Sequence, residues 1–196
     1  MYNSFKIVEK NYKTFYFTKG NILFAIMIVT TIMLSYYNEK NIFLKYATGL
    51  SILTCTSYFI TEYFRQEPFR GKFTGIITFN KTDLLINNRK IEIDQIKKIF
   101  LRTDDYEGMQ RGINTTMIRK SNGTNNLLDL DLKDGEKIKH FFQIEYRNQV
   151  DELKPFIINL IKNKLMTIEK GIEVLKLDND YVMENFTEEL NKKELD

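Results

Sequence analysis

The chain has 196 residues, of which 43% are hydrophobic and 28% are charged, and 29 basic against 26 acidic side chains give a net charge of +3. This length suits one ordinary domain, or a smaller domain with an appendage. Two prolines and nine glycines exclude collagen-like and Pro/Gly-rich disordered chains. A single cysteine and a single histidine exclude a disulfide scaffold, a thiolate metal cluster and a multi-histidine site.

The most hydrophobic part of the sequence follows an N-terminal segment, residues 1–20. Residues 21–37 contain no charged side chain, and a second apolar run, 42–61, begins after a four-residue stretch. The first run would form a helix about 26 Å long, close to the lower limit for crossing a bilayer core. We therefore expect a transmembrane helical hairpin over 21–64. The alternative is a buried hairpin in a soluble domain, but neither run has the polar face of a surface helix.

Basic residues around the two runs predict their orientation. Four lysines precede the first run and three basic residues follow the second, whereas only two lysines lie between the runs. The positive-inside rule then places both termini in the cytoplasm. The Lys-, Asn- and Ile-rich composition suggests a low-GC bacterial genome, so we expect a multi-pass protein of the bacterial inner (cytoplasmic) membrane.

From residue 71 the pattern changes to the alternation of extended strands. Asn122-Gly123 and Asp134-Gly135 are strong turn signals, because these residues tolerate a positive φ. The polar stretch 104–112 is expected to be a loop. The expected strands are 73–80, 83–87, 90–93, 99–103, 113–120, 127–132 and 136–146.

The apolar period lengthens to 3.6 residues over 148–165, which predicts one amphipathic helix. Pro155 falls inside this segment, so we expect either a kink or a later helix start. Together, residues 71–165 predict about seven antiparallel strands followed by a C-terminal helix.

This order of elements resembles the bacterial pleckstrin-homology-like (PH-like) membrane proteins that have an N-terminal transmembrane hairpin. The resemblance covers about residues 1–165 and rests on architecture, including the run GIITFNKTDLLINNRKIEIDQIKKI. It implies a membrane-anchored α+β fold, in which a bent antiparallel sheet or small barrel is closed by the C-terminal helix. It also implies a membrane-tethered cytoplasmic binding or scaffolding module, since the family has no shared chemistry. Another small α+β domain is the alternative fold.

The last segment, residues 166–196, forms an acidic C-terminal extension outside this pattern. Residues 171–177 could form one more strand or an extended arm. From Asp178 onward seven acids face two lysines, and a short helix capped by Asp178 could carry Val182, Phe186 and Leu190. Three roles are open for this extension: folding over the basic domain, binding a partner, or remaining solvated.

Chemistry-bearing side chains are scarce. His140 falls on the apolar face of an expected strand, where a buried, hydrogen-bonded histidine is the better interpretation than a catalytic one. Cys55 lies in the second apolar run, where packing is favoured over redox or metal chemistry.

Two groups of acidic residues are expected to lie at the protein surface. The cluster Asp104, Asp105 and Glu107 lacks the spacing of a calcium loop and is expected to be a solvated loop. Asp129 and Asp131 alternate along one strand and are expected on its solvent face. No nucleotide-binding, nucleophile-elbow or zinc-protease motif is present.

Anionic lipid is the most specific ligand that the sequence suggests. Phosphoinositide-binding members of the eukaryotic PH fold carry a basic cluster in the first hairpin, where this chain has only Lys81 beside Asp83. A looser basic group could contact an anionic headgroup surface, and a solvated basic face is the alternative. This basic group consists of Arg89, Lys90, Lys97 and Lys98.

The sequence therefore predicts a protein that binds rather than catalyses. We expect an integral membrane module that holds a protein partner or copies of itself. The alternatives are an accessory or regulatory subunit of a membrane enzyme or transporter, or an anionic-lipid binder. No catalytic, cofactor or metal residue, no nucleic-acid partner and no small-molecule substrate is evident.

Overall fold

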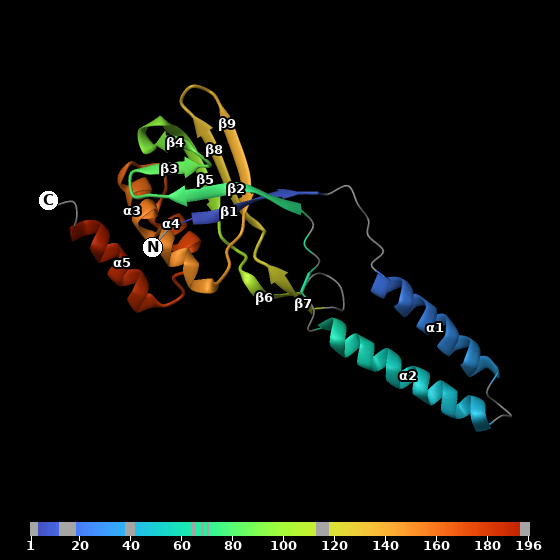
Figure 1. Ribbon diagram of the computed structural model, residues 1–196. Coiled ribbons are helices and arrows are strands. Elements are labelled where there is room, and N and C mark those ends of the chain that lie inside the picture. Colours follow the sequence, from blue (N-terminus) through green and yellow to red (C-terminus); the bar gives the residue numbers. More distant parts are fainter. Residues whose placement is uncertain are drawn as a thin grey trace. The chain divides into compact units, whose positions relative to one another are not determined.

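The fold is built around an antiparallel sheet whose first strand lies near the N-terminus (Figure 1). The computed structural model describes residues 4–11, 19–37, 42–63, 66–67, 69, 71–112 and 118–192. Two compact units result. One comprises residues 1–11, 68–109 and 121–196, and the other comprises residues 12–67 and 110–120.

Seven strands form the main sheet, in the order β4-β3-β2-β1-β9-β8-β5. Every strand pair in it is antiparallel. The strands are β1 (Ser4–Lys10), β2 (Gly71–Phe79), β3 (Asp83–Ile86), β4 (Arg89–Glu92), β5 (Ile96–Arg102), β8 (Asn126–Leu132) and β9 (Lys137–Phe142). A separate two-stranded sheet pairs β6 (Glu107–Gly112) with β7 (Ile118–Asn122).

The two edge strands of the main sheet are neighbours in sequence. Only the short 3₁₀-helix η2, Ile93–Gln95, separates β4 from β5, although these strands stand at opposite ends of the strand order. The Lys133 N–H also donates to the Gln95 carbonyl, at 2.9 Å. A connection of three residues spans only about 10 Å, so the sheet must curl until its edges approach each other.

Strand β1 lies between β2 and β9 and was not expected from the sequence. Its Phe5 and Ile7 are buried, whereas Lys6 between them is exposed. The Phe5 ring packs edge-on against Phe79 and Phe142, with centroids 5.3 and 5.5 Å apart. The segment that the sequence analysis assigns to a cytoplasmic N-terminus thus contributes to the middle of the core.

Three helices and one 3₁₀-helix complete this unit and gather beside the sheet (Figure 1). Pro155 lies in the first turn of α3, where its missing N–H costs nothing, so the helix starts later than the apolar period. Gly171 lets α4 approach α3, because a Cβ there would lie 2.8 Å from Cδ1 of Ile161. The elements are η3 (Arg147–Leu153), α3 (Lys154–Lys162), α4 (Ile168–Leu175) and α5 (Asp180–Lys192).

The two remaining helices, α1 (Lys19–Tyr37) and α2 (Ile42–Tyr63), are inserted between β1 and β2. Among the described residues, no helix combines the length and the apolar character needed to cross a membrane. In α1 the apolar stretch between Asn21 and Ser35 has 13 residues, or about 20 Å, against the roughly 20 residues that a bilayer core requires. In α2, Lys45 and six serine and threonine residues interrupt the apolar sequence.

This finding contradicts several expectations at once. The transmembrane hairpin over 21–64 is wrong, and with it the two-span membrane anchor and the multi-pass inner-membrane location with both termini in the cytoplasm. The fold observed is a mixed α+β fold with a seven-stranded antiparallel sheet.

Candidate functional site

α1 and α2 contact each other through one row of side chains on each helix. The inner row of α1 is Phe24, Met27, Thr31 and Leu34, and that of α2 is Thr48, Ser51, Cys55 and Tyr58; all eight are buried or half-buried. The hydroxyls of Thr31 and Ser51 lie 2.5 Å apart, and the Cys55 Sγ lies 3.9 Å from the Thr31 hydroxyl. The Phe24 and Tyr58 rings stack with centroids 5.3 Å apart. Cys55 therefore packs between the helices.

The outward sides of both helices expose many large apolar side chains. Among the described residues, seven large apolar side chains on each helix are between 40% and 80% exposed. Most follow alternating spacings of three and four residues, which is the spacing of a helix-packing seam. We call these the outer rows: Ile22, Ile26, Val29, Met33 and Tyr36 on α1, and Phe43, Tyr46, Leu50, Leu53 and Ile60 on α2.

Two of the four basic residues expected to contact anionic lipid are paired with acids. The Arg89 guanidinium donates to both carboxylate oxygens of Glu136, at 2.6 Å each. This hydrogen bonding raises the pKa of Arg89 and lowers that of Glu136. Lys90 forms ion pairs with Glu92 and Asp83, and its hydrogen bond to Glu92 raises its pKa.

The other two members of that group lie elsewhere. Lys97 and Lys98 are both exposed on β5, because a bulge between Ile96 and Lys98 breaks the alternation of the strand. The four basic residues thus sit on two edge strands, and acids compensate the pair on β4.

His140 lies on β9, opposite Leu128 of β8, and is half-buried. Burial lowers its pKa below the ordinary value, because desolvation disfavours the imidazolium ion. The partial burial of His140 agrees with the expectation that it lies on the apolar side of its strand.

The lowered pKa predicts a pH-dependent stability. Below the ordinary pKa of 6.5, His140 is protonated in the unfolded chain but is still largely neutral in the native protein. The free energy of unfolding therefore falls as the pH drops. We expect urea midpoints to decrease between about pH 7.5 and 5.5, and His140→Gln to flatten this decrease. Since His140 is the sole histidine, an unchanged slope in the variant would assign the effect to carboxylates.

In the acidic cluster Asp104, Asp105 and Glu107, the first two residues differ in exposure to solvent. Asp104 pairs with Lys176 and Arg102. Asp105, in contrast, is 1% exposed and accepts a hydrogen bond from the Asn125 N–H, so the expectation of a solvated loop is wrong for this residue. Within the described ranges, no three His, Cys, Asp or Glu side chains are placed to hold a metal ion.

The two aspartates of β8 lie beside lysines of β9. Asp129 is 3.2 Å from Lys139, and Asp131 is 3.6 Å from Lys137. Both carboxylates are partly exposed, as expected for a solvent-facing side of the strand.

The acidic extension folds onto its own domain through α5. Phe186 and Leu190 are buried, while Val182 remains 42% exposed. The Lys154 ammonium pairs with Glu189 at 2.7 Å and lies 5.9 Å from the centroid of the Phe186 ring. Residues 171–177, expected to form a strand or an extended arm, instead lie mostly in the helix α4.

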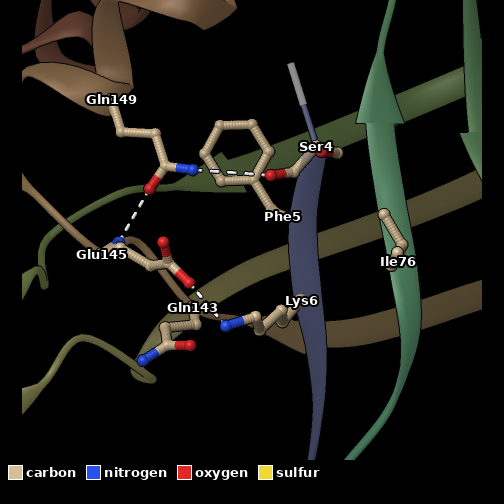
Figure 2. A pocket seen from close by; sticks show the side chains of 7 residues that line it. All are labelled: Ser4, Phe5, Lys6, Ile76, Gln143, Glu145 and Gln149. Atoms are coloured by element: carbon tan, nitrogen blue, oxygen red, sulfur yellow. Dashed lines mark hydrogen bonds and ion pairs between the residues drawn. The ribbon is translucent and has the colours of Figure 1, made fainter. Parts of the chain in front are cut away.

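A pocket of about 370 Å³ opens at the start of β1, where the ladder between β1 and β9 ends (Figure 2). The Lys6 ammonium and a Glu145 carboxylate oxygen lie 2.6 Å apart at its wall. Sequence reasoning missed this site, because its residues come from three separate segments. They are Ser4, Phe5, Lys6, Ile76, Gln143, Glu145 and Gln149.

Comparison with known proteins adds no relative: no family model matches the chain, and neither does any curated protein or solved structure. The resemblance to the PH-like membrane proteins is therefore not supported by a family match. Its defining feature, the transmembrane hairpin, is absent from the described helices. The function must be argued from the chain itself.

Proposed function

We propose that this protein is a non-catalytic scaffold that assembles with a second copy of itself through the outer rows of α1 and α2. The single observation that carries the proposal is the exposure of fourteen large apolar side chains on these two helices. Monomeric proteins rarely expose contiguous apolar patches larger than a few hundred Å².

The hydrophobic free energy of burying these side chains favours association of two copies. Each side chain that is about half exposed leaves roughly 1 kcal/mol of hydrophobic free energy unrealised. The sum over the outer surface is on the order of 10 kcal/mol, comparable with the roughly 4–15 kcal/mol that lost translational and rotational freedom costs.

A second copy is the occupant that best matches this surface. The outer rows carry no charge, so they offer nothing to steer or select a charged partner. Their three- and four-residue spacing is self-complementary, and a two-fold axis would let the same rows meet in both copies. Two helical pairs packed in this way form a bundle of at least four helices.

The proposal predicts a mass near twice the 23.4 kDa of the full chain in sedimentation and light-scattering measurements. The double variant Val29→Glu/Leu50→Glu places a carboxylate in each outer row. Because burial of an unpaired carboxylate is costly, we expect the dissociation constant to rise at least about a hundredfold.

The matched control puts the same charges at the margin of the outer rows. Thr30 and Thr54 are exposed on the same two helices, four residues after Ile26 and Leu50, and their hydroxyls donate to the carbonyls of these residues. Because a carboxylate at the margin can stay hydrated, Thr30→Glu/Thr54→Glu should raise the dissociation constant at least about tenfold less than the outer-row variant does. A monomeric wild-type chain, equal loss in both variants, or flotation of single copies with phosphatidylcholine vesicles would each overturn the proposal.

A further inference from the structure

We propose that α2 of each copy packs on α2 of the other, with the Leu50 side chain of each copy lying over Gly49 of the other. This inference rests on the proposed self-assembly and specifies which of the two helices lies at the two-fold axis. It makes Gly49 the point at which the two copies approach each other most closely.

Gly49 is a glycine whose presence the fold of the single chain does not explain. Among the seven glycines whose surroundings the structure describes, three have a positive φ, and three others stand where a Cβ would come within 2.8 Å of another atom. Gly49 has neither feature, since it lies inside α2 and nothing is within 4 Å of the position of its Cβ. Alanine at this position would make the isolated helix more stable, so a contact from outside the chain is the remaining reason for glycine.

Another helical glycine of the same chain shows such a contact. At Gly171 in α4, a Cβ would lie 2.8 Å from Cδ1 of Ile161 and 3.1 Å from Cγ2 of Ile157. Branched apolar side chains of α3 thus fill the space that the missing Cβ leaves. The corresponding space at Gly49 is open, and it has room for one such side chain from a second copy.

The neighbours of Gly49 are exposed apolar side chains of the outer row. Tyr46, Leu50 and Leu53 are 74%, 66% and 66% exposed. With Gly49 they occupy positions i, i+3, i+4 and i+7 of the helix, and four residues at this spacing form a hole that accepts one side chain of a facing helix. We call these four residues the Gly49 hole. Its glycine corner deepens it, and none of its members carries a charge.

The Gly49 hole faces away from α1, which lies along the other side of α2 (Figure 1). On that side Ser51 contacts Thr31, and Tyr58 stacks on Phe24. The first helix of the same chain therefore leaves the hole open.

Leu50 is the side chain of α2 that fits the Gly49 hole in a symmetric pair. Residues next to a two-fold axis meet their own counterparts in the second copy. Because Leu50 adjoins Gly49 in the chain, an axis at this point brings Leu50 of each copy over Gly49 of the other. A branched apolar side chain thereby enters each hole, as Ile161 does at Gly171.

The first test measures the dissociation constant of full-length Gly49→Leu by sedimentation equilibrium. The added side chain fills the hole and excludes Leu50 of the second copy, so we expect the constant to rise at least about tenfold. The variant should stay folded, as circular dichroism will check, because the space is open and leucine favours a helix more than glycine does.

Ala25→Leu is the control for added apolar volume. Ala25 is exposed on α1, and the substitution enlarges a side chain outside the Gly49 hole. We expect it to change the dissociation constant by less than about threefold.

A double variant tests which side chain enters the hole. Leu50→Ala alone should raise the dissociation constant about tenfold, and independent effects with Gly49→Leu would multiply to about a hundredfold. We expect no more than about tenfold for Gly49→Leu/Leu50→Ala, because the new leucine occupies space that the old one vacates. Residues at i and i+1 do not face each other on a helix, so this coupling must arise between copies.

The outcomes separate this pairing from self-assembly in general. If the wild-type chain is a dimer, the pairing is overturned by an unchanged or lowered constant in Gly49→Leu, by an equal loss in Ala25→Leu, or by the full hundredfold product in the double variant. Self-assembly through the outer rows would still stand in each case. A monomeric wild-type chain would overturn both.

Discussion

Replacing Gly123 by alanine is expected to abolish stable folding of the sheet domain. Gly123 has a φ of +68°, and a Cβ there would lie 2.1 Å from the Ile144 carbonyl oxygen and 2.6 Å from the Glu107 nitrogen. Both contacts are to backbone atoms of a hydrogen-bonded corner: the Glu107 N–H donates to the Ile144 carbonyl, and the Ile144 N–H donates to the Gly123 carbonyl, each at 2.9 Å. The clash can be relieved only by breaking this corner, so we expect a loss of more than about 4 kcal/mol.

Gly135→Ala is the matched control for backbone conformation alone. Gly135 also has a positive φ, +94°, but no atom lies within 4 Å of the position of its Cβ. The left-handed conformation should cost about 1–2 kcal/mol. Urea denaturation followed by circular dichroism measures both variants, and similar losses would show that the contacts of Gly123 do not matter.

Asn126→Leu is expected to have the second largest effect on stability. Asn126 is fully buried, and its Nδ2 donates to the carbonyls of Asp105 and Gly123, both at 2.8 Å, and of Phe142, at 3.2 Å. Its Oδ1 accepts from the Asp105 N–H at 2.9 Å. Leucine has a similar shape but satisfies none of these backbone groups, so we expect the free energy of unfolding to fall by about 3–5 kcal/mol.

The control for this variant is an asparagine near the surface. Asn159 donates from Nδ2 to the Lys81 carbonyl at 2.7 Å, in an exposed setting where water can replace the side chain. Asn159→Leu should cost less than about 1 kcal/mol. Equal losses at the two positions, measured by the same urea titration, would refute the special role of the buried network.

Strands with a strict alternation could be predicted from the sequence. The expected strand 127–132 corresponds to β8, Asn126–Leu132, and 83–87 corresponds to β3, Asp83–Ile86. In these segments apolar and polar residues alternate, or residues that favour turns mark the strand ends. The local sequence pattern and the tertiary structure therefore agree.

Other elements escaped prediction because tertiary contacts decide them. The sequence of β1 is short, is rich in charge and lies next to a long apolar run, yet Phe5 and Ile7 are buried. Residues 171–177 alternate weakly like a strand, but most of them belong to the helix Ile168–Leu175, which the Thr167 hydroxyl caps by accepting from the Lys170 N–H. The apolar runs of α1 and α2 had the composition of membrane spans but lack the length and continuity.

At the candidate sites, too, the sequence predicted the residue types but not the tertiary contacts. Arg89 and Lys90 were recognised as basic residues, but their acidic partners lie in separate turns or strands and could not be foreseen from spacing. The pocket at the start of β1 joins Lys6 to Glu145, which are 139 residues apart in the chain. Only the curled sheet brings such residues together.

The insertion of α1 and α2 between β1 and β2 has a consequence for how the protein is made. During synthesis β1 leaves the ribosome first, yet its partners β2 and β9 follow only after about 60 and 130 further residues. The helices α1 and α2 are therefore synthesised before β2 and all later strands of the sheet. Closure of the sheet must wait for nearly the whole chain, and such non-local pairing is intrinsically slow. A chaperone that shields the nascent helices would protect the chain during this delay.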